Sequence, residues 1–154
     1  MQKILFVCRG NICRSPMAQY LLAHLAAERG LACRTQSAAT SREELGNPIY
    51  PPARRKLREK GIPFGDHRAV QMTRQDYGAY DLLLAMDQAN VRNMTAIAGG
   101  DPAGKIRRLL DFTDHPRDIA DPWYTGDFEA TYDDLLQGCQ ALLDWLEGQD
   151  PPCV

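Results

Sequence analysis

The sequence has no long hydrophobic run. Residues 4–7 form its first apolar stretch, and neither that stretch nor any later one approaches the about 20 residues that a membrane-spanning helix needs. Four residues are also too few for the hydrophobic region of a secretion signal. We therefore expect a protein that neither spans a membrane nor is exported.

The chain also lacks an excess of charge of one sign. It carries 18 basic and 20 acidic residues, for a formal net charge of −2 at pH 7. Such a chain has no broad cationic surface to hold nucleic acid or anionic lipid, so we expect neither as a partner. Any site for an anion must be local.

Cysteine and histidine do not occur in the patterns of a metal site or a disulfide framework. Five cysteines cannot all pair with one another, and the three histidines complete no spacing that is typical of zinc ligands. We expect no metal and no other cofactor. Unpaired thiols are typical of a reducing compartment, which predicts a cytoplasmic protein.

The sequence does contain short apolar runs that alternate with amphipathic stretches, over a length that fits one domain, residues 1–154. The apolar runs predict strands at residues 3–7, 32–37, 81–86 and 106–110. The stretches between them predict helices that begin at Pro16, Pro51 and after Asp87, and a long last helix over residues 128–146. This alternation favours an α/β fold with a parallel sheet covered on both faces. We expect a monomer and leave a weak dimer open.

The segment Cys8-Arg9-Gly10-Asn11-Ile12-Cys13-Arg14-Ser15-Pro16 places an arginine six positions after a cysteine. Chance alone would supply about 0.45 such pairs in a chain of this composition, so the context must decide. A predicted strand precedes the pair, Gly10 and Asn11 tolerate unusual backbone angles, and a proline-initiated helix follows. Successive backbone N–H groups between a strand and a helix form an anion site, so the segment predicts a phosphate-binding loop.

This context favours Cys8 as a nucleophile and Arg14 as a clamp. The helix N-terminus stabilises a thiolate, which attacks phosphorus, and a guanidinium can hold two phosphate oxygens at once. The alternative is that Cys8 merely closes a buried strand. Ser15 could cap the helix or stabilise Cys8 as a leaving group, and Asn11 serves the backbone by accepting a left-handed conformation.

The strings CRGNICRSP and DPWYTGDFEATY together resemble the low-molecular-weight protein tyrosine phosphatases. Further similar stretches lie at residues 37–41, 46–57, 67–71 and 84–90. The resemblance implies a three-layer α/β/α domain with a four-stranded parallel sheet in the order 2-1-3-4. It also implies metal-free hydrolysis of phosphotyrosine in protein substrates, through a phosphoryl-cysteine intermediate. We expect phosphate or substrate to bind at Arg9, Gly10, Asn11, Ile12, Cys13, Ser15, Trp123 and Tyr124.

The resemblance places the general acid at Asp121, in the pair Asp121-Pro122. Physical reasoning agrees, because a phenol with a pKa of about 10 leaves poorly as an anion, and a positioned acid accelerates such a step by about 10²–10⁴. A nearby thiolate and phosphate would favour the protonated carboxyl, which could then act as base on water. The alternative is that Asp-Pro simply starts a turn.

Other positions follow from the resemblance with alternatives attached. Trp123 and Tyr124 would form an aromatic wall against the substrate ring, or else pack only within their loop. Ser37 and His67 would brace the phosphate loop through hydrogen bonds with Asn11, or else His67 is a hydrogen-bonded residue with a structural role only. Asp87 matches a family aspartate, but capping a helix is its expected direct role.

The loop also departs from the family pattern in ways that concern substrate choice. Arg9 stands where many relatives carry an apolar or small residue, and it could favour acidic substrates or be solvated at the rim. Residues 42–44 stand where some relatives place an aromatic residue, which leaves their substrate contacts open, and Tyr50 receives no such role. Ile12 resembles the phosphotyrosine branch, whereas phosphoarginine phosphatases tend to carry threonine there. Cys13 could form a reversible disulfide with Cys8, as in relatives, or pack as a small residue.

Rival functions remain open on this fold. A thiol-dependent arsenate reductase would need two further cysteines after the third strand, but residues 81–100 contain none. A phosphoarginine phosphatase shares the loop. A non-catalytic phosphoprotein-binding module is disfavoured by the intact Cys8, Arg14 and Asp121.

Overall fold

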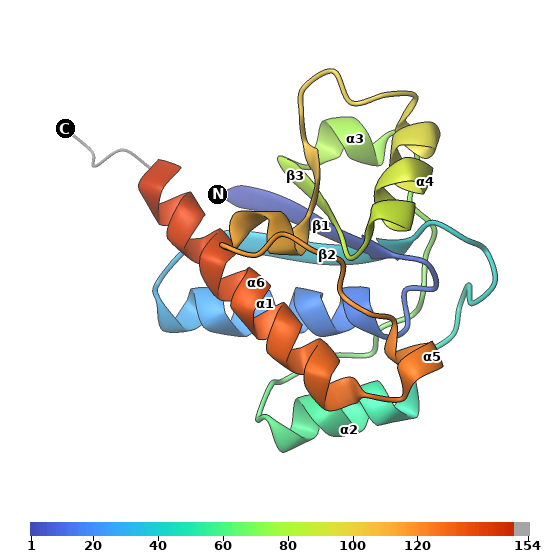
Figure 1. The fold of residues 1–154 in the computed structure, drawn as a ribbon, viewed down its shortest axis with the longest axis vertical. Helices are drawn as coiled ribbons and strands as arrows, with labels where there is room; N and C mark the ends of the chain where they lie inside the picture. Colours follow the sequence, from blue (N-terminus) through green and yellow to red (C-terminus); the bar gives the residue numbers. More distant parts are fainter. Residues whose placement is uncertain (150–154) are drawn as a thin grey trace.

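The computed structural model describes residues 1–149. Its centre is a four-stranded parallel sheet in the order β2-β1-β3-β4, which confirms the predicted order (Figure 1). The strands are β1 (Gln2–Cys8), β2 (Cys33–Ala39), β3 (Leu82–Ala85) and β4 (Ile106–Arg108). Residues 150–154, which include Cys153 and the end of the predicted domain, lie outside the described residues.

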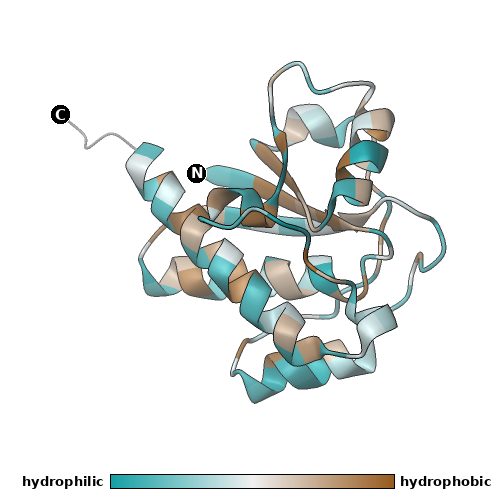
Figure 2. Cartoon of the chain, viewed as in Figure 1, coloured by the Kyte–Doolittle hydropathy of each residue, from teal (hydrophilic) through white to brown (hydrophobic). Residues whose placement is uncertain are grey.

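The central strand β1 shows why a continuous apolar run forms a strand here. Successive side chains of a strand point to opposite faces, and both faces of this sheet are covered. Ile4, Phe6 and Cys8 therefore pack into one hydrophobic cluster, while Leu5 and Val7 pack into another. Figure 2 accordingly shows hydrophobic residues along β1 and β3, between the two helical layers.

Helices cover the two faces of the sheet. One layer consists of α1 (Arg14–Glu28), α2 (Pro51–Glu59) and α6 (Phe128–Gln149), and the other of the short α3 (Asp76–Ala79) and α4 (Gln88–Ala98) (Figure 1). A 3-10 turn, η1 (Leu109–Phe112), follows β4, and a single helical turn, α5 (Pro122–Thr125), precedes α6. In residues 1–149, no helix is both long and apolar enough to cross a membrane.

Several predicted boundaries were wrong, each for a local reason. Helix α1 begins at Arg14 rather than Pro16, because the phosphate loop turns directly into it. The fourth strand ends at Arg108 rather than residue 110, because Leu109 and Leu110 are buried in the 3-10 turn. Sequence analysis did not predict α3 or α5, each only four residues long.

The loops that follow β1 and β3 meet at the carboxyl edge of the sheet. In open parallel sheets this edge is where ligands bind. The loop after β1 runs from Cys8 to Arg14, and Asp87 lies between β3 and α4. The segment that carries Asp121 reaches the same edge through a backbone hydrogen bond from Ile119 N to Met86 O, 2.9 Å long.

Candidate active site

The loop from Cys8 to Arg14 curls around Asn11, which is fully buried and has a φ of 60°. Its backbone N–H donates to Cys8 Sγ (3.3 Å), and its side-chain Nδ2 donates to Ser15 Oγ (2.8 Å). Its Oδ1 accepts from Val70 N (3.1 Å). Asparagine tolerates this left-handed conformation, and its amide holds the loop on two sides. The predicted backbone role of Asn11 is thus present, together with side-chain contacts.

Cys8 is the last residue of β1, and its sulfur lies 3.0 Å from Ser15 Oγ. Ser15 caps no helix, since α1 has no side-chain cap. Because Ser15 Oγ already accepts from Asn11 Nδ2, its own hydrogen is free to point at the sulfur. A hydroxyl and a backbone N–H aimed at one sulfur stabilise a thiolate there, both before attack and when the sulfur leaves.

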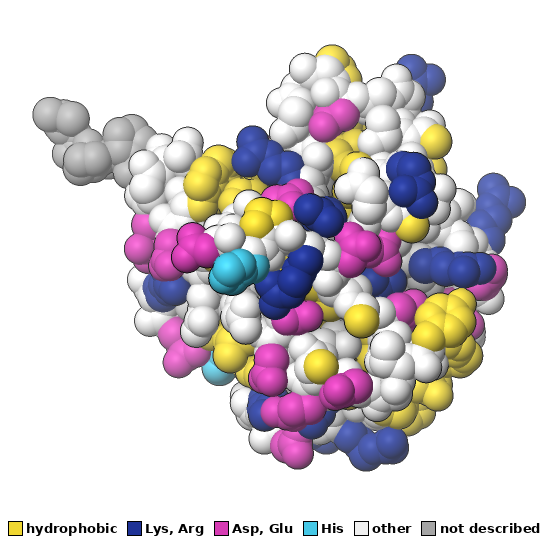
Figure 3. Space-filling model, viewed as in Figure 1, with side chains coloured by type: hydrophobic (Ala, Val, Ile, Leu, Met, Phe, Trp, Pro, Cys, Tyr) yellow, Lys and Arg dark blue, Asp and Glu magenta, His cyan; other side chains and the backbone are white. Residues whose placement is uncertain are grey.

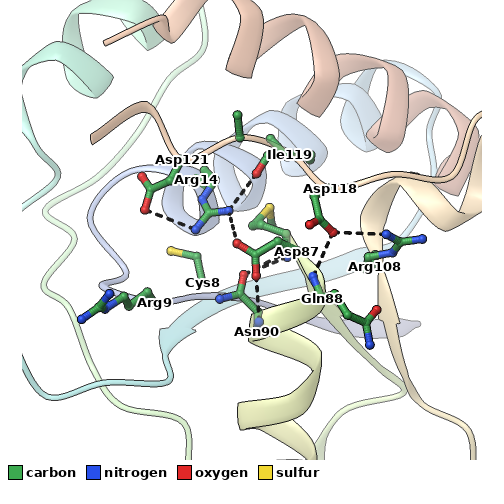
Figure 4. A network of polar contacts seen from close by, with 12 residues as sticks. Cys8, Arg9, Arg14, Asp87, Gln88, Asn90, Arg108, Asp118, Ile119 and Asp121 are labelled. Atoms are coloured by element: carbon green, nitrogen blue, oxygen red, sulfur yellow. Dashed lines mark hydrogen bonds and ion pairs between the residues drawn. The ribbon is translucent and has the colours of Figure 1, made fainter. Parts of the chain in front are cut away.

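Arg14 is buried, and residues outside the phosphate loop hold its guanidinium. Its Nη1 donates to Asp87 Oδ2 and to Ile119 O, both at 2.8 Å, and its Nη2 lies 3.4 Å from Asp121 Oδ2 (Figure 4). Burial lowers the pKa of Arg14, but Cys8 and the two aspartates outweigh it, so the net shift is upward. The guanidinium is therefore charged and fixed in direction.

Asp87 caps a helix, as predicted, and also binds Arg14. Its Oδ1 accepts from Asn90 N (2.7 Å) and so caps α4, while its Oδ2 binds Arg14. The same carboxylate thus starts a helix and orients the guanidinium.

Asp121 lies at the N-terminus of α5, where its Oδ1 accepts from Trp123 N (3.0 Å). Asp121-Pro122 therefore does start a helical turn, but this accounts for only one of the two carboxyl oxygens. The other oxygen, Oδ2, points toward Arg14, and Asp121 lines the same pocket as Cys8. One carboxyl oxygen is held by the backbone and the other is presented to the pocket.

The pocket is lined by loop residues, by two acidic residues of the neighbouring loop, and by the segment around α5. The lining residues are Cys8, Arg9, Gly10, Ile12, Cys13, Arg14, Glu43, Glu44, Asp121, Trp123 and Tyr124. Cys8 and Arg14 are almost wholly buried, whereas Trp123 is 50% and Tyr124 71% exposed. The pocket therefore has an ionic floor and an aromatic upper wall. Figure 3 shows hydrophobic side chains gathered over α5.

Tyr50, to which sequence analysis gave no role, supports this wall from behind. Its ring centroid lies 4.7 Å from that of Trp123 and 6.2 Å from that of Phe128. Tyr50 precedes α2 and Phe128 begins α6, so two helices fix the orientation of Trp123. Nothing in the sequence indicated this stack, because Tyr50 lies far from Trp123 and Phe128 along the chain.

The rim of the pocket carries an ion pair that sequence analysis missed. Arg9 Nη2 donates to Glu43 Oε1 (2.8 Å), and its Nη1 lies 3.5 Å from the hydroxyl of Tyr124. Glu44 packs over Gly10, where an added Cβ would lie 3.3 Å from Glu44 Cγ. Arg9 therefore spans the mouth from the loop after β2 to the aromatic wall.

The two predicted braces of the phosphate loop have different outcomes. His67 Nε2 donates to the backbone carbonyl of Asn11 (2.9 Å), as predicted. Since a carbonyl can only accept, Nε2 carries the hydrogen, and burial lowers the pKa of His67, which favours the neutral ring. For Ser37 the predicted bond to Asn11 was wrong: Ser37 Oγ donates to Gln19 Oε1, because β2 packs against α1 at that level.

Cys13 lines the pocket as a free thiol. Burial, reinforced by nearby Cys8, raises the pKa of its thiol, so the protonated form is favoured at Cys13. Cys33 and Cys139 are also free. Within residues 1–149, no three His, Cys, Asp or Glu side chains gather into a group that could hold a metal ion.

Comparison with known proteins identifies similar sequences over nearly the whole chain. Residues 3–150 match the family model described as low molecular weight phosphotyrosine protein phosphatase. The chain is 39% identical over 147 residues to the low molecular weight protein-tyrosine-phosphatase YfkJ of Bacillus subtilis, a match that covers 93% of this chain and 94% of that protein. It is 34% identical over 148 residues to PtpA of Staphylococcus aureus strain MRSA252, covering 95% and 94%.

Solved structures with a similar fold cover nearly the whole chain as well. The crystal structure of YfkJ from Bacillus subtilis superposes with a TM-score of 0.94 at 37% identity, covering 97% of each chain. The crystal structure of DARP, a Drosophila arginine phosphatase, superposes with a TM-score of 0.86 at 28% identity, covering 97% of this chain and 100% of that one.

Proposed function

The chain belongs to the low molecular weight phosphotyrosine protein phosphatase family, and on this premise we propose how its own residues hydrolyse phosphotyrosine in proteins. It is a cysteine-dependent phosphatase. The observation that carries the assignment of roles is the convergence of Cys8, Arg14 and Asp121 on one pocket, with Asn11 N and Ser15 Oγ both directed at the sulfur.

The phosphate group binds above Cys8, among the loop N–H groups and Arg14. In residues 1–149, Nη1 of Arg14 donates to Asp87 and Ile119, and Nη2 lies 3.4 Å from Asp121 Oδ2. This leaves Nε and the second hydrogen of Nη2 for two phosphate oxygens. A fixed, charged fork of this kind suits the equatorial oxygens of the transition state.

In the first step the Cys8 thiolate attacks phosphorus, an S–P bond forms and the bond from phosphorus to the phenolic oxygen breaks. Asp121 gives its proton to the departing oxygen, so the product is a neutral phenol rather than a phenoxide. In the second step water attacks the phosphoryl-cysteine and gives a proton to Asp121. The electron pair of the S–P bond returns to sulfur, where Ser15 Oγ and Asn11 N stabilise it.

The depth and the wall of the pocket select the substrate. A phosphotyrosine ring would lie against Trp123 and Tyr124 with its phosphate on the loop, whereas phosphoserine is too short to touch both. The fold alone does not separate tyrosine from arginine substrates, since an arginine phosphatase has a similar structure. Ile12 in the pocket supports the tyrosine branch, and Arg9 at the rim would bind acidic side chains that flank the phosphotyrosine.

The cysteines of the chain bear on where the protein acts and how its nucleophile is protected. The nucleophile must be reduced, and all four described cysteines are free thiols, which supports a cytoplasmic location. Its partners would be tyrosine-phosphorylated proteins, which it meets as a monomer. Cys13 beside Cys8 would allow a protective disulfide.

The test compares wild type, Cys8→Ser and Asp121→Ala on an aryl phosphate with a chelator present. We expect full activity in wild type, none in Cys8→Ser, and a loss of about 10²–10⁴ in Asp121→Ala. Activity that survives Cys8→Ser, or that the chelator removes, would refute the mechanism. Phosphotyrosine and phosphoarginine peptides, and arsenate with a thiol reductant, run in parallel, and faster turnover of either rival substrate would overturn the assignment.

A further inference from the structure

Asp118, three residues before the general acid, joins two other elements of the fold. Its Oδ1 accepts from the backbone N of Gln88 (2.9 Å) and from Arg108 Nη1 (3.1 Å) (Figure 4). Gln88 is the first residue of α4, and Arg108 is the last residue of β4. One carboxylate oxygen therefore ties the acid-bearing segment to a helix and to a strand.

The segment has little regular structure to hold it otherwise. Residues 116–121 are neither helix nor strand, yet Asp121 at their end must meet the leaving oxygen. Ile119, next to Asp118, donates to Met86 O (2.9 Å) and accepts from Arg14 Nη1 (2.8 Å). Two contacts attach the same segment to α6: Arg117 Nη2 donates to Asp134 Oδ1 (2.7 Å), and Thr131 Oγ1 donates to Ala120 O (3.4 Å). The segment is thus fixed at separate points rather than along its length.

Arg108 is well suited to fix Asp118, because it is itself fixed. Its Nε donates to Asp111 Oδ1 (3.0 Å), and its own backbone N donates to Asp111 Oδ2 (3.0 Å). The guanidinium thus bridges Asp111 in η1 and Asp118 in the acid segment. Gln88 N adds the positive end of α4, which also favours a carboxylate.

The contact between Asp118 and Gln88 lies next to the one that holds Arg14, the phosphate clamp. Asp87, which directly precedes Gln88, binds Arg14 Nη1 (2.8 Å). The clamp and the acid segment are therefore attached to adjacent residues at the start of α4. The Asp118 side chain is 53% exposed, and an exposed pair contributes little to stability, so its main consequence is geometric.

We propose that Asp118 is a positioning residue that holds Asp121 at the correct distance from the leaving oxygen by anchoring its segment to Gln88 and Arg108. The inference rests on the proposed role of Asp121 as general acid. Without the Asp118 carboxylate the segment loses its anchor just before Ile119, so the position of Asp121 is less well defined and proton transfer to the leaving group becomes less efficient. Attack by Cys8 and phosphate binding by Arg14 are unaffected.

The test uses leaving groups of different acidity, because only poor leaving groups need the acid. For Asp118→Ala, we expect kcat/KM to fall about tenfold on phenyl phosphate and less than about twofold on an aryl phosphate with a strongly acidic phenol. Asp144→Ala removes a comparable exposed partner of Arg29 (2.7 Å), at the other end of α1, and should alter neither value. An equal loss on both substrates with Asp118→Ala would mean a general structural defect and would overturn the proposal.

Further variants separate this proposal from the one on which it rests. In an Asp121→Ala background, Asp118→Ala should add less than about twofold, because the group it positions is absent. Asp118→Asn keeps an acceptor for Gln88 N and should restore the leaving-group profile to within about threefold of wild type. Failure of this rescue, or full additivity with Asp121→Ala, would overturn the role of Asp118. If Asp121→Ala itself showed no leaving-group dependence, the role of Asp121 would fail instead.

Discussion

Replacement of Asn11 tests how the phosphate loop is held and how Ser15 is oriented. Asn11→Gly keeps the left-handed backbone but removes the bonds to Val70 N and Ser15 Oγ. Ser15 is fully buried, and a buried polar group that loses its partner costs about 1–3 kcal/mol, whereas Val70 is exposed and loses less; we therefore expect the free energy of unfolding to fall by about 2 kcal/mol. Asn11→Ala loses the same bonds and must also adopt a φ of 60°, which adds about 1 kcal/mol.

The catalytic effect has a separate origin. Without Asn11 Nδ2, the Ser15 hydroxyl is free to rotate away from the sulfur, and a hydrogen bond to a charged group is worth about 1.5–3 kcal/mol. Per folded molecule, kcat on an aryl phosphate should therefore fall at least about tenfold in both variants.

Urea unfolding followed by tryptophan fluorescence measures the first quantity, and steady-state kinetics the second. The comparison of Gly with Ala isolates the backbone, since both lack the amide. Equal stability of the two variants would refute the argument about the left-handed turn. Wild-type kcat in Asn11→Gly would refute the orientation of Ser15 by Asn11.

Three other perturbations have outcomes that the structure determines. Gly138→Ala would place a Cβ 2.5 Å from Leu109 Cγ, so overpacking of about 1–3 kcal/mol should exceed the about 1 kcal/mol of helix propensity gained, and urea unfolding should show a net loss. Gly148→Ala, with open space around its Cβ, is the matched control and should not destabilise. Because burial lowers the pKa of His67 from 6.5, only the unfolded chain binds its proton just below pH 6.5. The free energy of unfolding should therefore decrease with falling pH, and His67→Gln should reduce that decrease. Glu43→Gln frees Arg9 and should lower KM about two- to fivefold for peptides with acidic flanks, an effect that added salt removes.

Each of these has a contrary result. Stabilisation by Gly138→Ala would show that Leu109 moves aside without penalty. An identical pH dependence in His67→Gln and wild type would show that the ring is not held neutral. An equal change in KM for acidic and basic peptides would show that Arg9 does not contact the substrate flank.

The sequence predicted the part of the site that is contiguous. Cys8, Arg14 and their loop lie within seven residues, so the strand before and the helix after them determine their geometry. Asp121 was predicted through the resemblance to the phosphatase family, whose general acid is the aspartate of a late Asp-Pro pair. Residues brought in from other loops were missed: Tyr50 behind Trp123, Val70 beside Asn11, and Asp118, which binds the first residue of α4. Their contacts depend on how distant segments pack, and no local spacing indicates that.

Two errors at individual residues have different causes. Ser37 was expected to bind Asn11, but its hydroxyl donates to Gln19 of α1 instead. Leu109 and Leu110 are apolar enough to extend a strand, yet Asp111 binds the backbone of Arg108 and turns the chain. A tertiary contact decided the first case, and a local contact between residues three apart decided the second.

The nucleophile is itself a residue of the central strand, and this makes activity a report on folding. Cys8 pairs with Ala39 of β2, and its carbonyl accepts from Thr40 N (3.0 Å). The sulfur reaches its position only when β1 lies between β2 and β3. A partly folded chain with helices formed but β1 unpaired would have no assembled loop and no turnover, so recovery of phosphatase activity during refolding would mark completion of the sheet rather than collapse of the chain.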